Sequence, residues 1–364
     1  MSIWRWARFL PEVPDEAQIT LGEGETPLVR STRIGPATGI ELYFKVESLN
    51  PTGSYKDRFA AVGVARMLAA GKRRCLSTSS GNTGSALAAY CARAGIECIV
   101  AAVETSSAEK LAQMAAHGAR IYRVARFGLD AELSQRVFGL LGELARDEND
   151  ETLISAFACS PEAMSGVQTI SYELHEQAAD LEHGLAHVFC PAGGGGLTLA
   201  VAEGFVKIKL AALLTGTPAV HCVQPAGNDT IAGPLRRGST SAEAVSCTTK
   251  IGGLQVPSVL DGDRVIAACR ASGGTGHVVS DEEVWDAQRR LALEEGISCE
   301  PAGATALAGA LRAASDGTLP SGAVVACLVT GAGWKDRQSQ ARFSAPADHL
   351  IDTDELERLL RRGS

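Results

Sequence analysis

Short apolar runs alternate with amphipathic stretches along most of the chain. Runs rich in Val, Ile and Cys predict strands, and apolar residues three or four positions apart predict helices. The predicted strands are 41–46, 74–77, 97–103, 120–124, 153–156, 187–190, 219–224 and 323–330. The predicted helices are 54–70, 82–94, 108–117, 130–147, 161–178, 197–214, 281–295 and 302–315, and residues 352–364 form a charged amphipathic tail helix.

This alternation of strands and helices predicts an α/β fold. Strands separated by helices form parallel sheets that helices cover on both faces. The chain has 364 residues, more than one compact core usually holds, so we expect two lobes, each a mostly parallel twisted sheet covered by helices. Such sheets bind ligands where the carboxyl ends of strands meet the starts of helices.

Composition narrows the range of partners. The formal net charge is -8, which is unlike a protein that binds a phosphate backbone, so we expect no nucleic-acid partner. No stretch approaches the roughly 18 apolar residues of a membrane span, so we expect no membrane partner. The first ten residues lack the apolar core of a signal peptide, which favours a cytoplasmic location.

The cysteines and histidines do not form a recognisable metal site. Ten cysteines are spread along the chain without a C-x-x-C pair, and several lie in apolar runs such as the one around Cys327. We therefore predict reduced core residues. The seven histidines lack ligand spacing, so we expect no metal.

The loop that follows the first predicted strand contains Lys56. It reads Asn-Pro-Thr-Gly-Ser-Tyr-Lys-Asp-Arg over residues 50–58, and Pro51 and Gly53 separate the strand from the helix. Lys56 then falls in the first helical turn, where the helix dipole is positive and a charged lysine is poorly placed. A neutral or imine-linked lysine avoids that penalty.

Three further loops at strand ends carry polar or glycine-rich sequences. Residues 79–85 read Ser-Ser-Gly-Asn-Thr-Gly-Ser, which suits either an anion site or a capped helix start. Four glycines, 193–196, precede a helix and let the backbone approach a phosphate closely. This loop lacks the Lys-Ser or Lys-Thr of a Walker loop and the pattern of a dinucleotide site. The fourth loop begins at Thr330, whose hydroxyl at a strand end can meet a ring nitrogen.

These loops together resemble the fold-type II pyridoxal-phosphate (PLP) enzymes of the tryptophan synthase β-like superfamily, and threonine synthases most closely. The resemblance covers roughly residues 20–336. It is carried by Gly-Glu-Gly-Glu-Thr-Pro-Leu (22–28), the Lys56 loop, Ser-Ser-Gly-Asn-Thr-Gly (79–84), Glu-Pro-Ala-Gly-Ala (300–304) and Thr-Gly-Ala-Gly-Trp-Lys-Asp (330–336).

The resemblance implies a role for each matched residue. Lys56 attaches the cofactor and moves the Cα proton of the substrate, and Asn82 binds the phenolic oxygen of PLP. Gly193, Gly194, Gly195 and Gly196 hold the cofactor phosphate, and Thr330 faces the pyridine nitrogen. The substrate carboxylate is implied to bind Ser79, Ser80, Asn82 and Thr83, and Gln168 is a further substrate contact.

The resemblance also implies a domain organisation. Residues 1–52 with 154–345 form the large PLP-binding domain, 53–153 form a smaller mobile domain, and 346–364 form the helical tail. Enzymes of this kind are usually dimers, so we expect a homodimer.

One segment departs from threonine synthases and leaves the substrate open. Where those enzymes have Asn, Ser and Arg near the substrate phosphate, this chain has Phe157, Ala158 and Ala163. The predicted activity is a PLP-dependent lyase acting on a small amino acid. It is either threonine synthase-like, converting O-phosphohomoserine to threonine and phosphate, or a serine/threonine ammonia-lyase, or a β-replacement enzyme that uses an activated serine. A non-enzymatic binding protein is disfavoured by Lys56.

Overall fold

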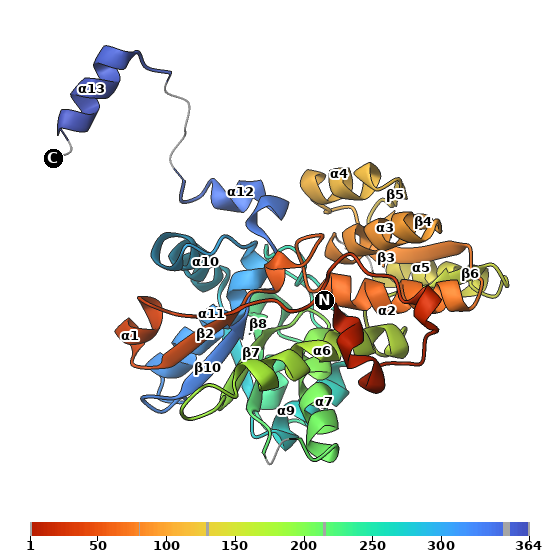
Figure 1. Ribbon diagram of the computed structural model, residues 1–364, viewed down its shortest axis with the longest axis horizontal. Helices are drawn as coiled ribbons and strands as arrows, with labels where there is room; N and C mark the ends of the chain where they lie inside the picture. Colours follow the sequence, from red (N-terminus) through yellow and green to blue (C-terminus); the bar gives the residue numbers. More distant parts are fainter. Residues whose placement is uncertain (1, 80, 129–130, 214–215, 345–349, 363–364) are drawn as a thin grey trace.

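Two helix-covered sheets form the framework of the protein (Figure 1). The computed structural model describes residues 2–79, 81–128, 131–213, 216–344 and 350–362. The sheets confirm the predicted α/β fold with two lobes.

The larger sheet is built from both ends of the chain. Within the described residues it has six strands in the order β1-β2-β10-β7-β8-β9, all parallel except β1, which runs antiparallel to β2. The carboxyl ends of β2, β10 and β7 therefore lie side by side. The strands are β1 Leu28–Arg30, β2 Glu41–Lys45, β7 His187–Pro191, β8 Ala219–Pro225, β9 Gly276–Val279 and β10 Val324–Leu328.

The smaller sheet comes from one continuous part of the chain. In the part that the structure describes it has four parallel strands in the order β5-β4-β3-β6. The strands are β3 Arg74–Ser79, β4 Glu97–Ala102, β5 Arg120–Arg123 and β6 Asp150–Thr152. The helices nearest to this sheet in sequence are α2 Lys56–Ala69, α3 Asn82–Ala94, α4 Ala108–Ala116 and α5 Ala131–Leu144.

Helices cover both faces of the larger sheet, and α10 and α11 lie on the face opposite α7 and α9. Side chains along β7 alternate accordingly: Val188 and Cys190 pack with α7, and Phe189 packs on the α11 side. The remaining helices are α1 Ile34–Thr38, α6 Pro161–Gln177, α7 Gly196–Leu210, α8 Ala232–Arg236, α9 Gly262–Ala271, α10 Asp281–Glu295, α11 Pro301–Ser315, α12 Arg337–Gln340 and α13 Thr353–Arg362.

One predicted strand is wrong. Residues 153–156 do not form a strand, because β6 ends at Thr152. The hydroxyl of Ser77 donates to the carbonyl of Leu153 (2.6 Å), and the Ala156 N–H donates to the carbonyl of Ile154 (2.7 Å), so the backbone turns away from the sheet. This turn places Ser155 in a loop instead of a strand.

The other predicted elements are present, with small shifts at their ends. Helices α3 and α10 begin and end at the predicted residues. Sequence patterns missed β1, α1, β6, α8, α9, β9 and α12. β1 is only three residues long, and α1, α8 and α12 have five or fewer, which is too short for a hydrophobic period to show.

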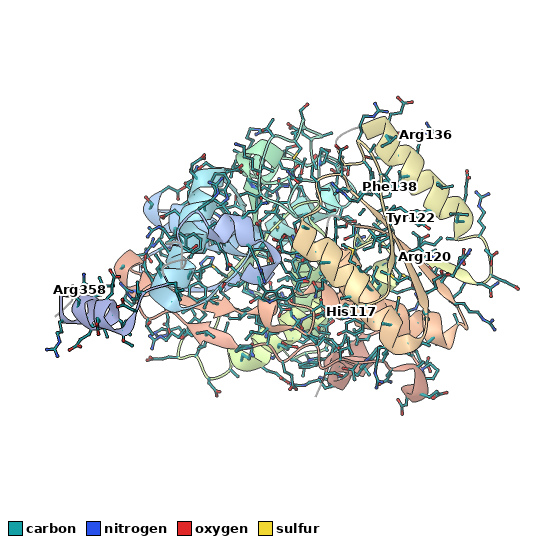
Figure 2. The ribbon with its side chains drawn as sticks, turned by 90° about the horizontal axis from the view of Figure 1, so that it is seen from above. His117, Arg120, Tyr122, Arg136, Phe138 and Arg358 are labelled. Carbon is teal, nitrogen blue, oxygen red and sulfur yellow. The ribbon has the colours of Figure 1, made fainter. Side chains whose placement is uncertain are left out.

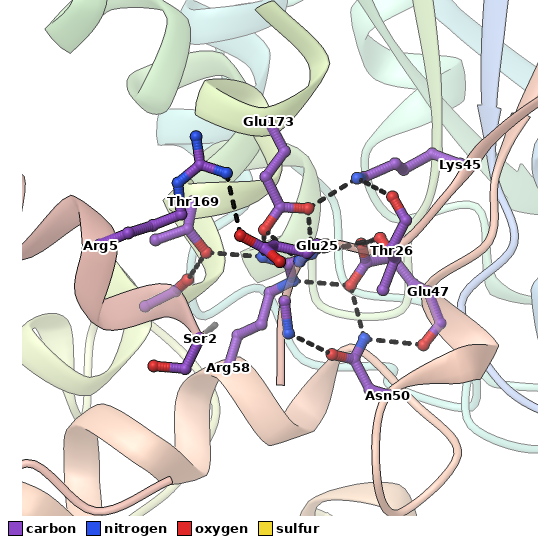
Figure 3. Close-up of polar contacts among 12 residues, drawn as sticks. Ser2, Arg5, Glu25, Thr26, Lys45, Glu47, Asn50, Arg58, Thr169 and Glu173 are labelled. Atoms are coloured by element: carbon purple, nitrogen blue, oxygen red, sulfur yellow. Dashed lines mark hydrogen bonds and ion pairs between the residues drawn. The ribbon is translucent and has the colours of Figure 1, made fainter. Parts of the chain in front are cut away.

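The long helix α2 joins the two lobes, because it packs against α3 on one side and α6 on the other. Arg58, two residues after Lys56, is fully buried and binds two carboxylates. Its guanidinium donates to Glu47 (2.8 Å) and to Glu173 (2.6 Å), and Glu173 also accepts from Lys45 (2.6 Å), as Figure 3 shows. Burial raises the pKa of Glu173, but the charges of Arg58 and Lys45 outweigh it and lower that pKa to about 2.

Three histidines form a hydrogen-bonded row across β7, β8 and β9. The ring nitrogens of His187 and His221 lie 3.1 Å apart, as do those of His221 and His277. The Thr275 N–H also points to Nδ1 of His221 (3.3 Å), so that nitrogen is an acceptor and neutral His221 carries its proton on Nε2. Burial lowers the pKa of His221 to about 3 and that of His277 to about 4.

The cysteines and the helix lengths agree with the composition. Eight of the ten cysteines are buried, as predicted, and Cys159 is exposed. Over the described ranges, no helix is long and apolar enough to cross a membrane, and no group of His, Cys, Asp and Glu side chains is arranged to hold a metal. Figure 2 shows Arg358 of α13 at the opposite end of the molecule from Arg136 of α5.

Replacing Arg58 with Met is expected to lower the free energy of unfolding by about 3–5 kcal/mol, because it leaves Glu47 buried without a paired cation and Glu173 with Lys45 alone. Urea unfolding at pH 7 measures the change. Arg66→Met on the same helix is the matched control: Arg66 pairs with Glu162 at the surface, and such pairs contribute about 0–1 kcal/mol. Equal losses in the two variants would contradict the assignment.

The histidine row is expected to make folding sensitive to acid. In the unfolded chain His221 and His277 take up protons near the ordinary histidine pKa of 6.5, whereas the folded protein holds them neutral down to about pH 4. The unfolded state therefore binds more protons in this window, and stability falls with decreasing pH by about 1.4 kcal/mol per pH unit for each histidine. His221→Leu should flatten the dependence of the free energy of unfolding on pH, measured by urea unfolding over a pH series. His117→Leu, at an exposed position, should leave that dependence unchanged. A wild-type slope in His221→Leu would contradict the role of the histidine row.

Candidate functional site

Lys56 is the first residue of α2 and lies where the two lobes meet. The segment before it is fixed to the loop after β10: Ser54 forms an isolated bridge with Gly331, and the Tyr55 N–H donates to the carbonyl of Thr330 (3.2 Å). The turn needs Gly53, which has a φ of +85° and whose Cβ would lie 2.7 Å from the Trp334 ring. These contacts set the position of Lys56 at the carboxyl edge of the larger sheet.

The amine of Lys56 is hydrogen-bonded to two hydroxyl groups in series. Its Nζ donates to Ser155 Oγ (2.8 Å), and Ser155 Oγ lies 2.9 Å from Thr83 Oγ1. Burial lowers the pKa of Lys56 to about 7, against the charge of Asp261, which raises it. An amine with this pKa both accepts and gives up a proton near neutral pH.

The loop before α3 brings polar groups from the smaller lobe to this point. Ser79 Oγ accepts the N–H groups of Gly81 (2.9 Å) and Gly84 (2.8 Å), so this hydroxyl shapes the loop. Asn82 Nδ2 donates to Glu300 Oε1 (2.5 Å) on the larger lobe. Thr83 faces Ser155, and Ser80, also predicted as a substrate contact, lies outside the described residues.

The four glycines lie between β7 and α7. Gly195 has a φ of +90°, and α7 starts after it without a side-chain cap, which leaves the first N–H groups of the helix for an anion. A Cβ at Gly193 would lie 2.9 Å from Val256, and one at Gly195 would lie 2.6 Å from Val265. Side chains are therefore excluded from both positions, and the backbone stays open to a ligand.

Thr330 lies two residues after the end of β10, which pairs with β2 on one side and with β7 on the other. The loop at its carboxyl end is therefore a neighbour of the glycine loop that follows β7. The structure thus brings together Lys56, Thr83, the glycine loop and Thr330, which come from four separate parts of the sequence.

Gln168 is the predicted site residue that the structure places elsewhere. It is buried on α6, and its amide donates to Glu203 on α7 (3.2 Å). This contact belongs to the packing of α6 against α7, and within the described ranges no hydrogen bond joins Gln168 to the residues around Lys56. Its role as a substrate contact stays a prediction.

Three polar residues near the site were missed: Ser155, Asp261 and Lys110. Ser155 accepts a hydrogen bond from Lys56, the negative charge of Asp261 raises the pKa of Lys56, and Lys110 of α4 pairs with Glu300 (2.8 Å) across the two lobes. Glu300 was recognised only as part of a motif. For Ser155 the signal was a hydroxyl residue in a segment that resembled a strand, whereas Asp261 had no local signal.

The residues at this place fit PLP. The amide oxygen of Asn82 is buried and has no hydrogen-bond partner among the described residues, which is unusual unless a ligand supplies one. The uncapped start of α7 suits a phosphate, and the amine of Lys56 suits a Schiff base.

Known proteins agree with this fit. The model of the family described as "Pyridoxal-phosphate dependent enzyme" matches residues 19–331. Threonine synthase of Methanocaldococcus jannaschii is 33% identical over 99% of this chain and 87% of that enzyme. The threonine synthase of Mycobacterium bovis is 35% identical over 90% of this chain and 86% of that enzyme.

Solved structures show the same fold. The crystal structure of threonine deaminase from T.th. has a TM-score of 0.70 and 26% identity, and the match covers 85% of this chain and 92% of that one. O-ureido-L-serine synthase, at 24% identity, matches with a TM-score of 0.66 over 92% of this chain and 96% of that one. The chain belongs to the family of pyridoxal-phosphate-dependent enzymes and is a threonine synthase-like lyase of fold type II.

Proposed function

We propose that the chain removes the Cα proton of a small amino acid and expels a substituent from the side chain, with Lys56 as the base. The observation that carries this proposal is the amine of Lys56, with a pKa lowered to about 7 and a hydrogen bond to Ser155, at the meeting point of both lobes. A group that titrates near neutral pH is suited to taking a proton and returning it.

The cofactor is held by residues from both lobes. Lys56 attaches it, Gly193 to Gly196 bind its phosphate, Thr330 meets the ring nitrogen and Asn82 meets the phenolic oxygen. When bound, PLP supplies an electron sink for the pair left on Cα. The neutral hydroxyl of Thr330 stabilises ring protonation weakly, which favours elimination over transamination.

The substrate carboxylate binds the loop before α3. The first backbone N–H groups of α3 point out of the helix toward an anion, and Thr83 and Asn82 supply side-chain donors. Ser79 Oγ accepts two backbone N–H groups, which holds the loop in shape, and its own O–H stays a donor for the carboxylate.

Two versions of the reaction differ in the leaving group. The relatives named threonine synthase favour release of phosphate from O-phosphohomoserine to give threonine. The two hydroxyls next to Lys56 and the likeness to a threonine deaminase favour a serine/threonine ammonia-lyase, which expels water and yields a keto acid and ammonia. A β-replacement on an activated serine needs an added nucleophile before product appears.

Three further features accompany this proposal. Residues 53–153 act as the smaller mobile domain, which closes on the larger domain through Asn82, Lys110 and Glu300. The chain forms a homodimer in the cytoplasm, as is usual for the family. Light scattering of the cofactor-bound protein tests the dimer.

Replacing Lys56 with Ala is expected to abolish the absorbance band of the lysine-bound cofactor and to lower elimination by about 10²–10⁴-fold, because the base is lost. Absorbance spectra and the release of keto acid or phosphate measure the two effects. Lys209→Ala, at an exposed position on α7, should change neither. A persistent band in Lys56→Ala rules out the assignment.

Replacing Ser155 with Ala is expected to lower kcat by about tenfold while KM and cofactor binding stay near wild type. The variant loses one hydrogen bond to the reacting amine, worth about 1 kcal/mol, and the proton path through it. Steady-state kinetics over a pH series measure the effect. Thr83→Ser keeps its hydroxyl and serves as the control; a change in KM alone for Ser155→Ala would assign this residue to substrate binding.

A further inference from the structure

The side chain of Gln224 joins the glycine loop to the segment that follows β8. Gln224 lies near the carboxyl end of β8 and is fully buried. Its Nε2 donates to the carbonyl of Gly193 (3.0 Å) and to Thr230 Oγ1 (2.9 Å). Its Oε1 accepts the N–H groups of Ile231 (2.7 Å) and Ala232 (2.9 Å) at the start of α8. Both protons and both lone pairs of the amide are therefore used, which fixes its orientation.

The strand places this amide on the face of the larger sheet where α7 begins. Residues 222 and 224 project from the same face of β8, and Cys222 packs in the cluster that contains Leu199 of α7. β7 and β8 are neighbours, and the Ala192 N–H donates to the carbonyl of Val223 (2.8 Å). The loop that starts at Ala192 therefore lies directly beside Gln224.

The carbonyl of Gly193 determines where the next N–H group points. In a trans peptide, such as the one that joins Gly193 and Gly194, the C=O and N–H groups point in opposite directions. Because Gln224 holds the carbonyl, the Gly194 N–H points away from Gln224. No backbone carbonyl among the described residues accepts a hydrogen bond from the N–H of Gly193, Gly194 or Gly195. These donors are therefore left for a ligand.

Apolar side chains limit the movement of the same loop. A Cβ at Gly195 would lie 2.6 Å from Val265 and 2.8 Å from Ile231. Ile231 is also the residue whose N–H group Gln224 accepts. The amide and these two side chains together fix the direction of the N–H groups of the loop.

Building on the proposed binding of the cofactor phosphate by this loop, we propose that Gln224 is the positioning residue that makes the site selective for a phosphorylated cofactor. Its four hydrogen bonds go to Gly193, Thr230 and the start of α8, so it acts through the Gly193 peptide and not on the reacting atoms. It directs the Gly194 N–H to the side of the loop that is left for the phosphate. Hydrogen bonds to a charged acceptor are strong and depend on direction, so a small rotation of this peptide weakens them.

A role in folding alone predicts a different result. If Gln224 only stabilised the fold, its loss would reduce the amount of folded protein and weaken the binding of ring and phosphate alike. The loss of a directed N–H group weakens the binding of the phosphate and leaves that of the ring unchanged. Pyridoxal, which has the ring and aldehyde of PLP but no phosphate, separates the two effects.

The experiment measures two dissociation constants in the full-length protein after its cofactor has been removed, one for PLP and one for pyridoxal. Titration of the absorbance band of the lysine-bound cofactor gives both. In Gln224→Met, which keeps the length of the side chain but cannot donate, the ratio of the pyridoxal constant to the PLP constant should fall by about tenfold or more. Because both constants come from the same variant, partial loss of folded protein does not affect the ratio.

Two further variants test the donor itself. Gln224→Glu keeps an acceptor for the start of α8 but cannot donate to Gly193, so the ratio should fall at least as far as in Gln224→Met. Gln288→Met is the matched control, since Gln288 is also buried and donates to the carbonyl of Cys299 (2.9 Å) and to Ser339 Oγ (3.0 Å). It loses the same number of donated bonds away from the glycine loop and should keep the wild-type ratio.

Each other outcome contradicts the proposal. An unchanged ratio in Gln224→Met overturns the role of Gln224 and leaves the proposed attachment of the cofactor to Lys56 intact. A fall in Gln224→Glu alone is an effect of charge and overturns it too, as does an equal fall in Gln288→Met. Wild-type protein that forms the band with neither compound overturns the proposed function as well.

Discussion

The buried guanidinium of Arg58 is the interaction on which the rest of the structure depends. It lies on α2 two residues after Lys56 and neutralises Glu47, which follows β2, and Glu173 on α6. Removing one partner would leave an uncompensated buried charge, so the three elements are held in one relative position. This cluster also fixes the position of Lys56, because the start of α2 cannot move without moving Arg58.

The same design of buried polar groups explains the chemistry of Lys56. A lysine at a helix start meets the positive end of the dipole and few water molecules, and both disfavour the ammonium form. Asp261 opposes this by its negative charge. The result is a pKa of about 7 for the amine of Lys56, which donates a hydrogen bond to the hydroxyl of Ser155.

The strong local signals of the sequence were sufficient to predict most of the fold. The ends of α3 and α10, the glycine loop and the position of Lys56 at a helix start follow from propensity, capping and glycine chemistry within a few residues. Failures occur where the deciding contact is distant in sequence. The strand predicted at 153–156 is a loop because Ser77 binds the carbonyl of Leu153. Asp261 reaches Phe157 across 104 residues, and Asn82 reaches Glu300 across 218; no local pattern encodes such pairs.

Gln168 shows how far a local pattern reaches, because the family match does not specify which neighbours its side chain contacts. It lies in a segment that matches the family, but on α6 its side chain turns toward Glu203 on α7. The position of a residue in a motif predicts the helix on which it lies. The face of that helix depends on the 3.6-residue period. Ser155, in a loop with no such period, reaches Lys56 instead. The hydroxyl that we propose to act beside Lys56 therefore comes from an irregular segment, and the proposed cofactor contacts come from regular junctions of strands and helices. Junctions of strands and helices have local sequence signals, whereas contacts between distant segments do not. The sequence therefore predicts the cofactor but not the leaving group.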